Sequence, residues 1–181
     1  MLEPAHMHRQ TLLESMKEFF SDDERVRFYN AVGFKNFDMY VHDSDEKIVS
    51  RVSIVERDGE LLLAGYIFAE VNRYTMIVEN VALVAFPNSK GNVLIETCRD
   101  FVRFVDELGN LGFVSGQFFA VVGGPGLSNY RKLTKMKPDI IREVGIVPAG
   151  FRSFDGKYYD IVNFSMLWKD NMAKNKYMGT V

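Results

Sequence analysis

Residues 78–108 have the sequence VENVALVAFPNSKGNVLIETCRDFVRFVDEL, and this stretch decides the fold that we predict. The apolar run at residues 78–86 favours a buried strand, and Pro87 stops the strand from continuing. A long helix is predicted to begin near Asn92. Its apolar face, at helical spacing, consists of Leu94, Cys98, Phe101, Val105 and Leu108. The charged residues of the helix, Asp100 among them, are predicted to lie mostly on other faces.

The loop between this strand and this helix is suited to binding an anion. The first turn of a helix has backbone N–H groups without intrahelical partners, and the aligned peptide dipoles place partial positive charge there. Gly91 permits close backbone approach or a positive φ, Lys90 adds a charge and Ser89 adds a hydroxyl group. The alternative is an ordinary tight turn with a solvated Lys90. The sequence contains neither GxxxxGK[ST] nor GxGxxG, so a standard nucleotide loop is not predicted.

Composition predicts one ordinary globular domain over residues 1–168, followed by a polar tail at residues 169–181. The chain has 181 residues, of which 47% are hydrophobic and 25% charged. A net charge of −2 gives no general attraction to nucleic acid, and a small basic cluster (Arg131, Lys132, Lys135 and Lys137) is more often a solvated helix face. No apolar span approaches the ~20 residues of a membrane helix. Neither nucleic acid nor a membrane is therefore an expected partner.

The single cysteine, Cys98, excludes an internal disulfide and is expected to be a core thiol, not a nucleophile. The three histidines have no Cys or acidic partners at ligand spacing, so no metal site is predicted. These features favour a reducing, cytoplasmic compartment.

The residues before the long helix predict helices first and then strands. Residues 1–34 are expected to hold two helices, one at residues 11–20 and one opened by a capping box at Ser21 and Glu24. Three antiparallel strands follow from Lys47 to Phe86. The first turn between them is at Asp58-Gly59, a strong hairpin signal.

After the long helix, residues 113–122 predict a strand that is apolar enough to be buried on both faces. It follows a helical crossover, so it should lie parallel to the strand ending at Phe86. A helix capped by Ser128 comes next, and Pro138 ends it or begins another short helix through Val144. Residues 146–154 and 158–168 form the last strand pair. The predicted fold class is α/β (α+β): a mostly antiparallel mixed sheet with one central parallel pair and helices on both faces.

This order of elements over about residues 35–168 resembles the GCN5-related N-acetyltransferase family, which binds acetyl-coenzyme A. The family's loop is roughly VxPxx[RQ]Gx[GA], between its fourth strand and third helix. Here the loop fits at Pro87, Lys90 and Gly91 and departs at Ala85 and Val93. Val93 stands where the family has a small residue that lets the backbone approach the pyrophosphate.

The resemblance implies a coenzyme site along the loop. Backbone amides of residues 89–93 would hold the pyrophosphate, and the end of the strand would pair with the pantetheine arm like an added strand. The gap toward the strand at residues 113–122 would take the thioester. The residues implied to bind acetyl-CoA are Val84, Ala85, Phe86, Ser89, Lys90, Gly91, Asn92, Val93 and Asn129.

The resemblance also implies two catalytic residues. Tyr130 lies in a Tyr-Arg-Lys-Leu stretch similar to the family's Tyr-x-Lys-Leu, whose tyrosine protonates the leaving thiolate. The Gly-Phe that normally follows comes only at Gly150-Phe151. Glu79 lies about where members often keep an acidic base. The structural alternatives are a solvated strand residue for Glu79, a ring packed on the sheet for Tyr130 and a helix cap or solvated amide for Asn129.

Two functions remain open on these residues. The first is an acetyl-CoA-dependent N-acyltransferase that acts on an amine of a small molecule or protein. The second is a catalytically silent protein of the same fold that serves an assembly, for instance within a phage particle, or forms a homo-oligomer. Val93 and the displaced Gly-Phe motivate the second.

Overall fold

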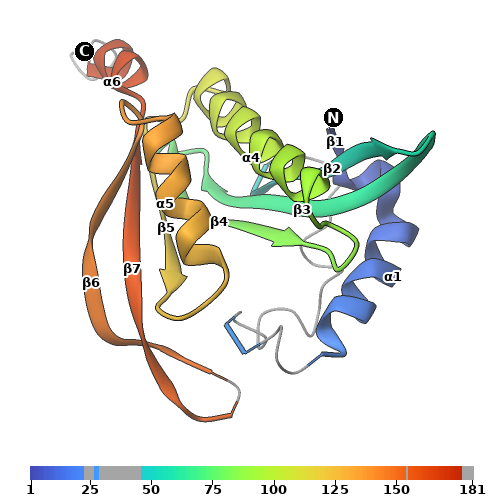
Figure 1. Cartoon of the computed structure of the whole chain (residues 1–181). Helices are drawn as coiled ribbons and strands as arrows, with labels where there is room; N and C mark the ends of the chain where they lie inside the picture. The colour runs from blue at the N-terminus through green and yellow to red at the C-terminus, as the bar shows by residue number, and fades with distance from the viewer. Residues whose placement is uncertain (23–26, 29–45, 154, 177–181) are drawn as a thin grey trace.

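The computed structural model describes residues 1–22, 27–28, 46–153 and 155–176, and these residues contain one seven-stranded sheet (Figure 1). The strand order is β1-β2-β3-β4-β5-β7-β6. All neighbouring strands are antiparallel except β4 and β5, which are parallel. The strands are β1 (Leu2–Pro4), β2 (Ile48–Arg57), β3 (Glu60–Asn72), β4 (Ile77–Ala85), β5 (Ser115–Val121), β6 (Ile141–Arg152) and β7 (Tyr158–Leu167). The predicted mixed sheet is confirmed.

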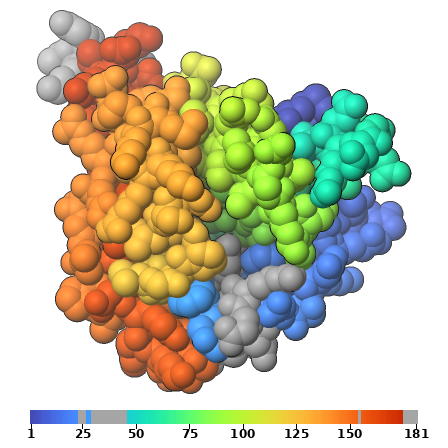
Figure 2. Space-filling model, viewed as in Figure 1, coloured from blue at the N-terminus to red at the C-terminus, as the bar shows by residue number. Residues whose placement is uncertain are grey.

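Helices cover both faces of this sheet, as predicted. The described helices are a 3-10 turn (Ala5–His8), α1 (Arg9–Phe20), α4 (Asn92–Asn110), α5 (Gly126–Met136) and α6 (Lys169–Lys176). Alternate residues of β3 separate the two layers: Tyr66 and Phe68 pack in the α1 core, whereas Ile67 and Ala69 pack in the α4 core. Figure 2 shows α4 and α5 side by side on one face. None of the described helices is long and apolar enough to cross a membrane.

The parallel pair at the centre of the sheet is short. β4 and β5 pair only at Ile77–Ser115 and Val78–Gly116. Gly116 permits this contact, because a Cβ there would lie 2.8 Å from the Cβ of Val78. After these two pairs β5 has β7 as its only partner strand among the described residues. The β5–β7 ladder runs from Ser115 to Val121. The sheet therefore opens between β4 and β5, toward the loop that follows β4.

The buried face of α4 is wider than the apolar spacing predicted, and Asp100 is the main correction. This carboxylate is fully buried. It accepts a hydrogen bond from Ser53 Oγ at 2.8 Å and one from Arg103 at 2.6 Å. These partners compensate the cost of burying a charge, so a residue that composition places at the surface lies in the interface with β2.

Other expectations differ at the ends of elements. β5 is not buried on both faces, because Gln117 and Phe119 are exposed where the strand leaves β4. Ser128 lies inside α5, which begins at Gly126 with no side-chain cap. The possible short helix after Pro138 is wrong, since β6 begins at Ile141 and pairs with β7 from that residue on.

The two ends of the chain also differ from the predictions. The expected polar tail begins as helix α6, and the Asn171 amide ties it to the carbonyls of Gly109 and Phe113 at 2.7 and 2.8 Å. At the other end, Ser21 terminates α1 by donating to the carbonyl of Glu18 at 2.7 Å. The second N-terminal helix falls largely outside the described residues.

Candidate functional site

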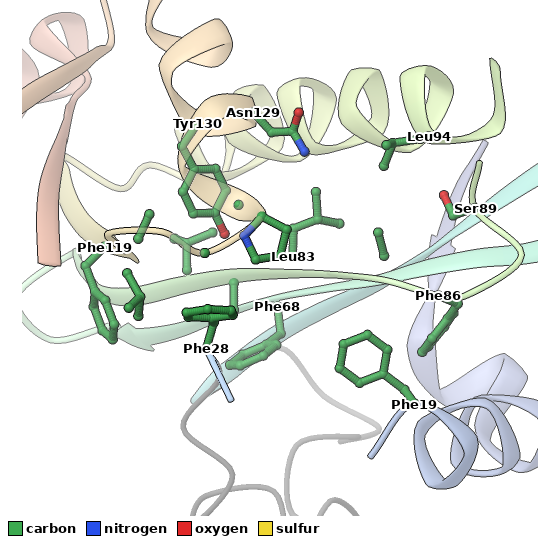
Figure 3. Close-up of a pocket in the computed structure, with 18 of the residues that line it drawn as sticks. Phe19, Phe28, Phe68, Leu83, Phe86, Ser89, Leu94, Phe119, Asn129 and Tyr130 are labelled. Atoms are coloured by element: carbon green, nitrogen blue, oxygen red, sulfur yellow. The ribbon is translucent and has the colours of Figure 1, made fainter. Parts of the chain in front are cut away.

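A cavity of about 390 Å³ occupies the opening between β4 and β5 (Figure 3). On one side of β4 it is lined by the loop, α4 and α5, which contribute Ser89, Lys90, Leu94, Asn129 and Tyr130. We call these residues, with the backbone of the loop, the coenzyme side, because the family resemblance implies a coenzyme site there. On the other side it is lined by Phe19, Phe28, Phe68, Phe86 and Phe119, which we call the aromatic wall. In Figure 3 the two groups lie on opposite sides of the β4 ribbon.

The loop presents backbone N–H groups where α4 begins. Gly91, the residue before the helix, has φ 56° and ψ −125°, a conformation that a side chain would strain. A Cβ at Gly91 would meet no atom within 4 Å, so its positive φ is what requires glycine. In the described part of the chain, the N–H groups of Gly91, Asn92 and Leu94 donate to no protein acceptor. They are oriented by the helix as an anion site requires.

The other loop amides already have partners within the loop. The N–H of Ser89 donates to the carbonyl of Phe86 at 2.8 Å, and that of Lys90 to Asn88 at 3.0 Å. The N–H of Val93 donates to the carbonyl of Lys90 at 3.2 Å. Of the five amides that the resemblance implies, those of Gly91 and Asn92 have no protein acceptor among the described residues, and the same holds for Leu94.

Ser89 and Val93 stabilise the loop through hydrogen bonds and packing on its buried side. Thr97 gives its hydroxyl proton to the carbonyl of Val93 at 2.8 Å, so the buried Ser89 hydroxyl donates to Thr97 Oγ1 at 3.2 Å. The Val93 side chain packs against Val55 and Ala64 and does not line the cavity. The branched residue at this position therefore does not obstruct the opening. Lys90 is exposed and lines the cavity at the loop.

The last residues of β4 divide between core and cavity. Val84 is fully buried against Tyr66 and Phe68 on the α1 face. Ala85 and Phe86 line the cavity, and the N–H of Phe86 donates to the carbonyl of Ala64 at 2.9 Å. After the Val78–Gly116 pair, no described residue of β5 pairs with β4. This edge of β4 is therefore open to an extended ligand.

Tyr130 is placed by an aromatic cluster. Its ring lies 4.9 Å from that of Phe118, 5.8 Å from Phe101 and 5.9 Å from Phe164, measured between centroids. The residue is buried, and its hydroxyl group points into the cavity (Figure 3). Packing thus fixes the ring and aims the phenol at the gap. Asn129, one residue earlier on α5, is half-buried and also lines the cavity.

Glu79 lies outside the cavity. It is exposed on β4, and its carboxylate accepts a hydrogen bond from the Asn72 amide at 3.4 Å. Its neighbour Asn80 lines the cavity instead. Across the ladder from Asn80 is Glu70. Burial raises the pKa of Glu70, and the nearby Glu79 carboxylate raises it further. No carboxylate occurs among the described residues that line the cavity.

The aromatic wall is the part of the site that the sequence analysis did not find. Its members come from α1, residues 27–28, β3, the loop and β5, and each has the apolar character of a core residue. Phe19 and Phe86 pack edge to face at 6.5 Å between centroids. No local pattern distinguishes a phenylalanine that borders a cavity from one that fills a core.

The described residues also bear on the predictions about metal ligands and the single cysteine. Across the described ranges, no group of three His, Cys, Asp or Glu side chains is placed to hold a metal ion. Cys98 is half-buried on α4 and does not line the cavity. Burial raises its pKa, an effect that Lys132 partly offsets, so the thiol is poorly reactive.

Comparison with known proteins identifies the fold. No protein-family model matches this sequence, and no curated protein matches it. Among solved structures, the ribosomal-protein-alanine N-acetyltransferase from Brucella melitensis is similar with a TM-score of 0.61 and 13% identity, over 93% of this chain and 99% of that one. A chimera of the spermidine N-acetyltransferase SpeG from Vibrio cholerae and hSSAT is similar with a TM-score of 0.59 and 16% identity, over 89% of this chain and 93% of that one.

The ribosomal-protein-S18-alanine N-acetyltransferase from Escherichia coli is also similar, with a TM-score of 0.52 and 14% identity, over 74% of this chain and 75% of that one. All three comparisons span most of both chains. The chain has the fold of the GCN5-related N-acetyltransferases.

Proposed function

We propose that this protein is an N-acyltransferase that moves an acetyl group from acetyl-CoA to an amine of a small molecule or protein. One observation supports this above the others: β4 and β5 part after two residue pairs, and the cavity in the opening is lined by Lys90 and Leu94, which flank the unpartnered N–H groups of Gly91 and Asn92. An extended thioester with a diphosphate at one end fits this combination of an open strand edge and a helix N-terminus.

Each part of the coenzyme would have its own contacts. The diphosphate would accept hydrogen bonds from the N–H groups of Gly91, Asn92 and Leu94, with Lys90 nearby as a positive charge. The pantetheine arm would lie along the open edge of β4 near Ala85. The thioester would then lie in the gap, within reach of the Tyr130 hydroxyl.

The proposed chemistry is direct transfer. The lone pair of a neutral amine attacks the thioester carbonyl, the new C–N bond forms and the C–S bond breaks. The amine nitrogen loses one proton to water or to a carboxylate. Tyr130 gives its phenolic proton to the thiolate and regains one from solvent, so charges and atoms balance. Direct transfer needs neither a metal ion nor a covalent enzyme intermediate.

Calorimetric titration with acetyl-CoA tests the binding step. We expect saturable heat with one site per chain and an acetyl-CoA-dependent rise in the unfolding temperature. Coenzyme A without the acetyl group should also bind, because the diphosphate contacts are the same. No heat and no thermal shift at millimolar acetyl-CoA would refute the proposal.

A second function, as an interaction component without catalysis, is favoured by the outer edge of the sheet. β6 is an edge strand, and residues 142–150 are exposed, including Val144, Ile146 and Val147. An exposed apolar edge strand favours pairing with another chain, such as a second copy. Light scattering combined with a coenzyme-release assay separates the two functions. An assembly that binds no acetyl-CoA supports the second, and a monomer that turns over acetyl-CoA rules it out.

A further inference from the structure

The aromatic wall is more extensive than transfer of a two-carbon acetyl group requires. Phe19, Phe28, Phe68, Phe86 and Phe119 all line the cavity, on the side of β4 opposite the coenzyme side (Figure 3). Phe119 remains 37% exposed although it borders the cavity, so its ring has room for a further apolar contact. A ligand group that covered the rings of Phe119 and the half-buried Phe28 would remove apolar surface from water on both partners.

The described lining of the cavity offers no carboxylate to pair with an ammonium group. Lys90, at the loop, is the only charged residue among the described residues that line the cavity. A polyamine has several ammonium groups, and each needs a carboxylate or a carbonyl cluster to replace its hydration. The aromatic wall offers ring faces instead, which suit an apolar body that ends in a single amine.

The position of the wall assigns it to the acceptor. The Tyr130 phenol and Ser89 lie on the coenzyme side of β4 in Figure 3, and the proposed diphosphate contacts, Gly91 and Asn92, follow Ser89 in the same loop. An acetyl group carried through the gap ends at the gap, so the space beyond it is left for the amine. We propose that the acceptor is a primary amine bearing an aromatic or similarly apolar group, which packs against the aromatic wall. This inference rests on the proposed acetyltransferase function and specifies its substrate class.

Release of free coenzyme A from acetyl-CoA, measured with the full chain and three amines, tests the inference. Phenethylamine supplies an aromatic group, ethylamine has the same amine without the ring, and spermidine is a polyamine. We expect kcat/KM for phenethylamine to exceed that for either other amine by about 10-fold or more, the range that apolar contacts give. The gain should fall mainly in KM, since the ring binds away from the reacting atoms.

Matched variants locate the effect. Phe119→Ser removes a partly exposed ring from the wall, and we expect it to reduce the preference for phenethylamine over ethylamine about 10-fold. Tyr74→Ser removes a ring that is 97% exposed and lies outside the cavity, so it should leave the preference unchanged. An unchanged preference in Phe119→Ser and in a second variant, Phe28→Leu, would overturn the inference.

The remaining outcomes are also decisive. Turnover that favours spermidine overturns the acceptor class while leaving the acetyltransferase function intact. Turnover that requires octanoyl-CoA instead of acetyl-CoA, with no preference among amines, would assign the aromatic wall to the acyl chain. This result would also overturn the inference. Failure to bind acetyl-CoA in calorimetry refutes the proposed function itself, and with it the inference.

Discussion

The two sides of β4 are built from the chain in different ways. The coenzyme side comes mainly from one continuous segment, the end of β4, the loop and the first turn of α4, with Asn129 and Tyr130 added from α5. The aromatic wall collects single phenylalanines from five separate places between Phe19 and Phe119. The first side offers backbone donors whose geometry depends on one glycine. The second offers side-chain surface whose shape depends on the whole fold.

This difference predicts different sensitivity to mutation. A backbone site fails when its loop changes conformation, whereas a wall of several rings loses affinity gradually as rings are removed. The variants below separate the two sides, beginning with the largest expected effect.

Gly91→Asp should abolish coenzyme binding while the fold survives. An aspartate strains the φ of 56° at this position and places a negative charge beside the diphosphate. Two like charges in contact near a protein surface repel each other by a few kcal/mol. We therefore expect acetyl-CoA affinity to fall by about 100-fold or more. Isothermal calorimetry measures the change.

Gly59→Asp is the matched control for Gly91→Asp. Gly59 also has a positive φ, 82°, and open space around its Cβ, but it lies in the β2–β3 turn. It should show similar backbone strain with unaltered acetyl-CoA affinity. Equal loss of affinity in both variants would mean that general destabilisation, not the loop, controls binding.

Tyr130→Phe should slow transfer without weakening coenzyme binding. The ring packing against Phe118 and Phe164 is retained, and only the hydroxyl group that points into the cavity is lost. Removal of a general acid typically lowers kcat about 10²- to 10⁴-fold. Tyr159→Phe, which alters a tyrosine outside the cavity lining, is the control. Wild-type kcat in Tyr130→Phe would remove this residue from the mechanism.

Val93→Ala tests whether the coenzyme side tolerates a branched residue at its helix start. Because the side chain packs against Val55 and Ala64, truncation should cost about 1–2 kcal/mol of unfolding free energy and leave acetyl-CoA affinity unchanged. Chemical denaturation and calorimetry measure the two quantities. A marked gain in affinity would show that valine obstructs the diphosphate after all.

The smallest effect is expected at Glu70 and Glu79, which lie beyond Asn80 and outside the cavity lining. The pKa of Glu70 is raised mainly by burial and to a smaller extent by the Glu79 carboxylate. Glu79→Gln should therefore lower the pKa of Glu70 but leave it above its ordinary value. Carboxyl-carbon NMR titration measures the shift, and Glu56→Gln, at the far end of β2, is the control.

The sign of the pH dependence follows from this shift. A carboxyl whose pKa is raised on folding stabilises the folded state below its unfolded pKa, and this stabilisation is lost as pH rises through the folded value. Glu70→Gln should therefore raise the unfolding temperature more at neutral pH than in acid. An unfolding temperature that rises equally at both pH values would assign the gain to packing and not to titration.

The comparison also explains what the sequence could predict. The strand, Pro87, Gly91 and the helix beginning at Asn92 are consecutive, so local pattern sufficed to place the loop, and the parallel pair followed from the crossover. The family resemblance implied that β4 and β5 diverge, and their ladder of two residue pairs agrees with this. Asp100 was misplaced because its partner Ser53 is on β2, far from α4 in the sequence. Burial of a charge through distant partners leaves no local signal.

The candidate site divides in the same way. Tyr130 borders the cavity because α5 follows β5 closely, whereas Glu79 is turned away at the irregularity in the β3–β4 ladder between Glu70 and Val71. Such a bulge changes which face a residue occupies, and alternation alone does not reveal it. The aromatic wall depends on long-range packing throughout, so no pattern of phenylalanines along the chain indicated it.

The central claim is that the open N–H groups at the start of α4 bind the diphosphate of acetyl-CoA. Amide NMR of the ¹⁵N-labelled chain during titration with acetyl-CoA tests it most directly. The account predicts that the Gly91 and Asn92 resonances shift and saturate together with the binding heat, while that of Gly59 stays in place. Saturable binding that leaves Gly91 and Asn92 unperturbed, or no binding at millimolar coenzyme, would contradict it.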